Sequence, residues 1–101
     1  MIRNVVLGRL REQEDPETVA RDRAVAEEGL AGIAGLDLPG LLAMHVGSDL
    51  GLREGGWSFA ITNDWVDADA YRGYDADPEH LRSRNMLVQV CSEVARVQFE
   101  M

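Results

Sequence analysis

The stretch Trp57–Val66, WSFAITNDWV, alternates large and small side chains along its length. Successive side chains of a β-strand point to opposite faces, so this period of two predicts a strand with one buried face. It is the clearest strand in the chain, and the remaining elements can be placed around it. Its predicted inward face holds Trp57, Phe59, Ile61, Asn63 and Trp65.

Three further segments have strand patterns. Residues 2–10 carry apolar side chains on both faces, which predicts a strand that is covered on both sides. Residues 94–100, VARVQFE, predict a closing strand. Residues 41–47, LLAMHVG, form the remaining predicted strand, with Leu42, Met44 and Val46 on one face and Ala43 and His45 on the other.

The tripeptide Asp-Pro-Glu marks a helix start twice, at residues 15–17 and 77–79. Aspartate is a favoured N-cap, proline suits the first helical position, and glutamate complements the positive end of the helix dipole. Apolar residues at helical spacing predict that the first helix runs to about residue 34. The second helix is predicted to reach about Glu93.

A short helix over residues 66–74, capped by Asp67, precedes the second Asp-Pro-Glu signal, so Pro78 divides this helical region. The element order is therefore β-α-β-β-α-β. This order predicts an α+β ferredoxin-like sandwich, a four-stranded antiparallel sheet with helices on one face, in a single domain over residues 1–101. The other sheet face is mixed rather than polar, which predicts a partner sheet in a symmetric homodimer.

Composition and charge narrow the function classes. The formal net charge of −8 argues against nucleic acid and against anionic membrane surfaces, which both attract clustered basic residues. The N-terminal segment has too short an apolar run for a signal sequence or a membrane span. Cys91 is the only cysteine, so it has no intrachain disulfide partner. We expect a cytoplasmic protein without nucleic-acid or membrane partners.

No metal or cofactor signature is present in the sequence. The two histidines and the single cysteine lie far apart and fit no zinc spacing. The aspartates of residues 64–77 fit no calcium-loop template, and helix caps with solvated surface explain them. Residues 53–56, REGG, lack a phosphate-loop pattern. We therefore expect neither a metal site nor a cofactor.

The segment Tyr74–His80, YDADPEH, places an acid and a base around a helix break. If Asp77 caps the helix, His80 is its third residue, where the positive end of the dipole disfavours imidazolium. The adjacent carboxylates push the other way, so the sequence leaves the direction of the pKa open. His80 shares a helical face with Leu87 and Cys91, and we expect that face to point inward, beside Asn4 and Phe59.

Two interpretations of Tyr74 and His80 remain at this point. A neutral imidazole can act as a general base, and a phenol can donate a hydrogen bond to a carbonyl oxygen as negative charge develops there. Alternatively, Tyr74 is a core aromatic residue and His80 bonds to backbone near the helix cap. Spacing alone favours the second interpretation.

Several stretches together resemble the stress-responsive A/B barrel (Dabb) domain family. They are MIRNVVLGRL, VGSDLGLREGGWSFAITNDW, AYRGYDADPEHL and VARVQFE, which cover nearly the whole chain. The most specific element is Tyr-x-x-x-Pro-x-His, present here as Tyr74, Pro78 and His80. The resemblance implies a homodimer whose two ferredoxin-like sheets form a dimeric α/β barrel. The family includes stress-induced plant proteins and a plant polyketide cyclase, in which the matching tyrosine and histidine are catalytic.

This chain departs from the cyclase at two cavity positions. Asn4 stands where many family members carry a histidine, and Phe59 stands where the cyclase has another. The resemblance therefore implies a more apolar pocket with one titratable base. We expect Tyr74 and His80 to be its catalytic pair if it is an enzyme. The predicted ligand-binding residues are Asn4, Val6, Trp57, Phe59, Ile61 and Leu87.

Three functions are consistent with these residues. The first is a dimer that binds a small, largely apolar metabolite, with a stress response as one setting. The second is a cofactor-independent polyketide cyclase, lyase or isomerase, with His80 as general base and Tyr74 as carbonyl polariser. The third is a cofactor-free monooxygenase, a class found in the wider superfamily of dimeric α/β barrels.

Overall fold

The computed structural model describes residues 1–101 and contains four strands and three helices. The strands form one antiparallel sheet in the order β2-β3-β1-β4. The elements are β1 (Ile2–Leu10), α1 (Pro16–Ala34), β2 (Leu41–Ser48), β3 (Phe59–Trp65), α2 (Ala68–Ala76), α3 (Pro78–Val90) and β4 (Cys91–Glu100).

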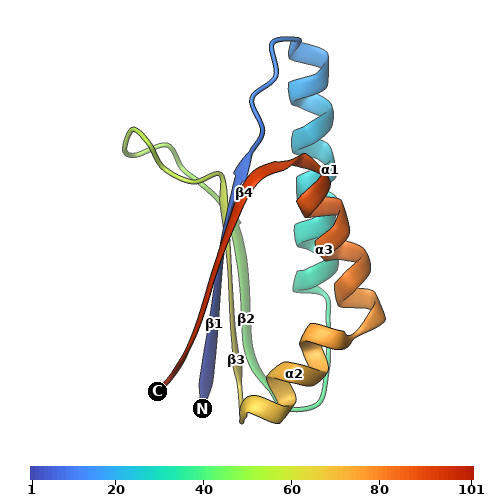
Figure 1. The fold of residues 1–101 in the computed structure, drawn as a ribbon, viewed down its shortest axis with the longest axis vertical. Helices are drawn as coiled ribbons and strands as arrows, with labels where there is room; N and C mark the ends of the chain where they lie inside the picture. The colour runs from blue at the N-terminus through green and yellow to red at the C-terminus, as the bar shows by residue number, and fades with distance from the viewer.

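All three helices lie on one side of the sheet, so the predicted ferredoxin-like α+β fold is confirmed (Figure 1). Helices α1 and α3 run along the sheet, and α2 crosses near the end where β1 begins (Figure 1). None of the helices is long and apolar enough to cross a lipid bilayer.

The three predicted helix caps are confirmed. Asp15 accepts a hydrogen bond from the Glu17 amide, Asp67 from the Ala70 amide, and Asp77 from the His80 amide. Each cap satisfies a backbone donor that the helix itself leaves without a partner. The last cap fixes where α3 starts, and with it the direction in which the His80 side chain leaves the helix.

The boundary between α3 and β4 was predicted wrongly. Helix α3 ends at Val90, not near Glu93, and β4 begins at Cys91, three residues earlier than predicted. Cys91 has extended backbone angles and pairs with Leu10 of β1. Sheet pairing with β1 therefore takes these residues out of the helix, and Cys91 does not continue the inward helical face.

Two strand predictions also need correction. Strand β3 begins at Phe59, so Trp57 precedes it. In β2 the register shifts between Leu41 and Ala43, and the bulge leaves Leu42 exposed, so it does not share a face with Met44 and Val46 as predicted. Met44 and Val46 pack against the core.

The core lies between the sheet and helices α1 and α3. Its buried cluster consists of Ala26, Leu30, Ile33, Phe59, Ile61, Leu87 and Val90. Gly8 of β1 faces the Phe59 ring, because Gly8 and Phe59 pair across the sheet. An added Cβ at Gly8 would overlap that ring, so the absence of a side chain there makes room for Phe59.

Candidate functional site

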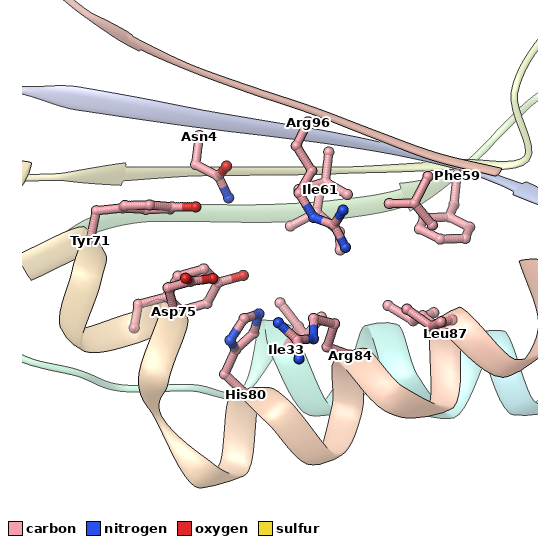
Figure 2. A pocket seen from close by; sticks show the side chains of 14 residues that line it. Asn4, Ile33, Phe59, Ile61, Tyr71, Asp75, His80, Arg84, Leu87 and Arg96 are labelled. Atoms are coloured by element: carbon pink, nitrogen blue, oxygen red, sulfur yellow. The ribbon is translucent and has the colours of Figure 1, made fainter.

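A small pocket opens between the sheet and the helices α2 and α3 (Figure 2). Its lining is mostly apolar, and its free volume is about 30 Å³. That is enough for about one or two water molecules. The deepest residues are buried, whereas Arg96 and Val88 are exposed and Arg84 is partly exposed. The mouth therefore lies between α3 and the edge strand β4.

An aromatic stack forms one wall of the pocket. The Tyr74 ring lies between Trp65 of β3 and His80 of α3, with ring centroids 4.9 Å and 3.9 Å away. Tyr74 and His80 come from different helices, and the break at Pro78 turns the chain so that their rings meet. The sequence motif thus brings the predicted pair into direct contact.

A buried polar network supports the floor of the pocket. Asn63 Oδ1 accepts hydrogen bonds from Asn4 Nδ2 at 3.1 Å and from Trp65 Nε1 at 2.6 Å. Asn4 Oδ1 in turn accepts from Gln98 Nε2 at 2.9 Å. Buried amides are costly when left without partners, and here the oxygens of both asparagines are occupied. Asn4 is therefore held by the protein and lines the pocket as a fixed group.

His80 is the exception among the buried polar groups. The side chain is 5% exposed, and its Nδ1 is buried without a hydrogen-bond partner. Burial lowers the pKa of His80 below its ordinary value of 6.5, and Arg84 adds to this effect. The backbone carbonyl groups of Asp75 and Tyr74 and the Asp75 carboxylate oppose it. Burial thus decides the direction that the sequence left open, in favour of the neutral imidazole.

Tyr74 has the opposite role in proton chemistry. Burial raises the pKa of Tyr74 to about 12, although the neighbouring Asn63 side chain opposes the shift. The phenol therefore keeps its proton at neutral pH and can donate a hydrogen bond. A proton acceptor and a proton donor thus lie in ring contact at one pocket.

The structure brings seven of the eight predicted site residues to this pocket. They are Asn4, Val6, Phe59, Ile61, Tyr74, His80 and Leu87. Trp57 does not line this pocket: it lines a different hollow, together with other residues of the loop between β2 and β3, and its ring lies under the Arg9 guanidinium at 4.2 Å. The alternation of Trp57–Val66 suggested one inward face, but the chain joins the sheet only at Phe59.

Four polar residues of the pocket were not predicted: Tyr71, Asp75, Arg84 and Arg96. Helical spacing could have indicated two of them, because Tyr71 precedes Tyr74 by three residues and Arg84 follows His80 by four. Arg96 has no such local signal. Its face depends on the pairing of β4 with β1, where Arg96 lies opposite Val6.

The side chains offer no site of the type that holds a metal ion. No group of three or more His, Cys, Asp or Glu residues is arranged for coordination. The chemistry available at the pocket is therefore hydrogen bonding, proton transfer at His80 and charge from Asp75, Arg84 and Arg96.

We expect the His80 ring to titrate below 6.5 when followed by NMR, because burial disfavours imidazolium. The unfolded chain then binds the extra proton more readily than the folded chain. The resulting stability is complete above the unfolded pKa and is lost as the pH falls from about 6.5 towards the folded pKa.

Between about pH 7 and about pH 5 the wild type should lose stability through this protonation, and a His80→Asn variant should not show that loss. A His45→Gln variant identifies which ring signals belong to His80. A titration of His80 at or above the ordinary value would contradict burial as the dominant influence on its pKa.

Comparison with known proteins places the chain in one family of this fold. Residues 2–101 match the model of the Stress responsive A/B Barrel Domain. No curated protein matches the chain with significant similarity.

Among solved structures, a dimeric ferredoxin-like protein of unknown function from Bacteroides fragilis has a TM-score of 0.85 and 22% identity, over 99% of this chain and 95% of its own. A dimeric ferredoxin-like protein from Thermobifida fusca has a TM-score of 0.77 and 26% identity, over 99% and 90%. A hydroxynitrile lyase from Passiflora edulis has a TM-score of 0.65 and 18% identity, over 99% and 92%.

Proposed function

The chain belongs to the stress responsive A/B barrel domain family, and we propose that it is a homodimer whose pocket binds a small, largely apolar metabolite. The observation that carries the proposal is the buried, unpartnered Nδ1 of His80 at a mostly apolar pocket. A buried polar atom without a partner costs stability, so a ligand or ordered water that bonds to it is favoured.

The outer face of the sheet supports the proposed dimer. Val97 and Phe99 of β4 are 54% and 45% exposed there, and Val97 pairs with Val5 of β1. Burying such a row against a second copy removes apolar surface from water. The proteins from Bacteroides fragilis and Thermobifida fusca, which share the fold, are both described as dimeric.

Pocket size sets a condition on the ligand. The free volume of about 30 Å³ is far below the roughly 300 to 1,000 Å³ of ordinary ligand sites. An organic ligand therefore enters only if the side chains at the mouth move aside. Arg84 and Arg96 suit this, because long, partly solvated side chains change rotamer at low cost.

Proton transfer at carbon is a second candidate function, and the contact between His80 and Tyr74 favours it. Neutral His80 takes a proton from the carbon next to a substrate carbonyl, and the C–H electron pair moves into the carbonyl to give an enolate. The enolate oxygen accepts a hydrogen bond from Tyr74. Return of the proton elsewhere, ring closure or loss of a leaving group gives isomerase, cyclase or lyase chemistry.

One experiment tests binding and separates these functions. The purified protein, with its mass checked by light scattering against twice 11.2 kDa, is mixed in D₂O with neutral aromatic ketones from acetophenone to larger polyketide-like compounds. Binding predicts saturable shifts of the His80 ring signals in NMR. A binder without turnover leaves the α-protons of the ketone to exchange at the buffer rate.

An enzyme accelerates that exchange, and His80→Gln should then slow it by about 10²- to 10⁴-fold while the fold remains. Trp57→Ala, outside the pocket, is the matched control and should leave ketone binding unchanged. Oxygen uptake in the same samples would point to the monooxygenase alternative. If no ketone perturbs His80, proton transfer at a ketone is wrong. The binding proposal itself is wrong if small apolar acids and amides also leave the His80 signals unchanged.

A further inference from the structure

Two arginine side chains point into the pocket from opposite walls. Arg84 extends from α3 beside His80, and Arg96 extends from β4 on the sheet side (Figure 2). Arg84 follows His80 by one helical turn, which places both on the same face of α3. Arg96 lies opposite Val6 in the sheet, which places it on the face that the helices cover.

Neither arginine has a carboxylate partner. Five of the other eight arginines form ion pairs within 4.0 Å: Arg3, Arg9, Arg11, Arg72 and Arg82. The remaining three form none, but they do not line this pocket. With 18 acidic residues in the sequence, carboxylates are plentiful, yet none pairs with Arg84 or Arg96. Two guanidinium groups thus share one small pocket with the unpartnered Nδ1 of His80.

We propose that the ligand of this pocket carries one carboxylate, which Arg84 and Arg96 hold between them at the mouth. The inference rests on the proposed binding function and names the class of ligand. A guanidinium offers parallel N–H donors that match the two oxygens of a carboxylate. The apolar part of the ligand then points inward, against Ile61 and Leu87, and reaches His80.

The charges around the mouth favour a single negative charge. Asp75 also lines the pocket, so two arginines and one aspartate give a formal local charge of +1. A carboxylate neutralises that charge, whereas a phosphate dianion would leave a net negative site next to Asp75. The net charge of −8 for the whole chain adds to the penalty for a dianion.

Movement of the two arginines lets so small a pocket accept a ligand. The two guanidinium groups repel each other when the pocket is empty, and a carboxylate between them turns repulsion into two attractive contacts. The arginines would move outward to admit the apolar part and then close over the charged end. Arg84 and Arg96 are in this view binding residues, and His80 remains the group at the inner end.

The test compares heptanoate with heptanamide, a matched pair of probes that differ in charge. Affinity is measured by calorimetry, and occupancy of the pocket is followed by the NMR signals of the His80 ring. Wild type should bind heptanoate roughly 10-fold or more tightly than heptanamide, as expected for charge-assisted hydrogen bonds. Arg84→Gln and Arg96→Gln should each reduce heptanoate affinity by about 10-fold and leave heptanamide affinity nearly unchanged.

The control is Arg82→Gln on the same helix. Its side chain is 71% exposed and pairs with Glu79, so we expect no effect on either probe. Arg84→Lys and Arg96→Lys keep the positive charge but lose the paired N–H donors of the guanidinium. They should therefore retain part of the preference for the carboxylate. Circular dichroism of each variant checks the fold.

The outcomes separate this inference from the proposed function. Equal affinity for both probes, unaffected by the arginine variants, overturns the carboxylate inference while leaving an apolar binding pocket. Failure of heptanoate, heptanamide and all the ketones to perturb His80 overturns both. A preference that Arg82→Gln removes as strongly as Arg84→Gln shows a general charge effect and also contradicts the inference.

Discussion

Trp65→Ala is expected to lower the free energy of unfolding by about 3 to 5 kcal/mol, as for other large aromatic residues removed from a core. Trp65 is fully buried, its Nε1 donates to Asn63 at 2.6 Å, and its ring stacks on Tyr74. The substitution leaves a cavity and removes one of the two donors that occupy the Asn63 oxygen. A loss of this size is a large share of the stability of a small domain.

The chain supplies its own control in the second tryptophan. Trp57 is only partly buried, and its main contact is the Arg9 guanidinium over the ring at 4.2 Å. Trp57→Ala should cost about 1 kcal/mol, the order of an exposed cation–π contact. Urea unfolding followed by far-UV circular dichroism, at equal protein concentration because a dimer is proposed, measures both. Equal losses in the two variants would contradict the placement of Trp65 in the core.

Gly8→Ala is expected to destabilise the protein by about 2 to 3 kcal/mol, the upper part of the usual range for overpacking. An added Cβ would stand 2.7 Å from Phe59 Cε1 and closer still to other atoms of that ring. Phe59 is buried and fixed in the core cluster. The ring must therefore leave its position, and because it lines the pocket, the shape of the pocket changes too.

Gly73→Ala is the matched control, since a Cβ at Gly73 of α2 meets nothing within 4 Å. There the extra methyl group should be neutral or slightly stabilising, because alanine restricts the unfolded chain. Phe59→Leu should be less harmful in the Gly8→Ala background than in wild type, so a double-mutant cycle by urea unfolding should show coupling. Purely additive losses would mean that the two residues do not share the same space.

The fold follows from short-range patterns that can be recognised directly in the sequence. Alternation along β3, apolar spacing along α1, and aspartate caps before Pro16 and Pro78 each depend on residues a few positions apart. The same holds for the contact between Tyr74 and His80, because one helix break between close neighbours directs both rings. Local backbone preferences decide such features before distant parts of the chain meet.

The predictions from sequence were wrong or incomplete for features that depend on contacts between distant segments of the chain. Helix α3 ends at Val90, earlier than predicted, because Cys91 pairs with β1. Trp57 does not lie on the predicted face because β3 begins only at Phe59. The direction of the His80 pKa also required the tertiary structure, because opposing local charges are decided by burial under neighbouring elements.

The positions of Arg84 and Arg96 show most clearly the difference between what local sequence and what tertiary structure determines. The sequence by itself determined the element order, the caps and the Tyr74/His80 pair, since each is encoded within a few residues. Only the tertiary structure decided that an arginine of α3 and an arginine of β4 face one pocket. Strand register and helix packing place both side chains at the pocket, and both depend on contacts between residues far apart in the chain.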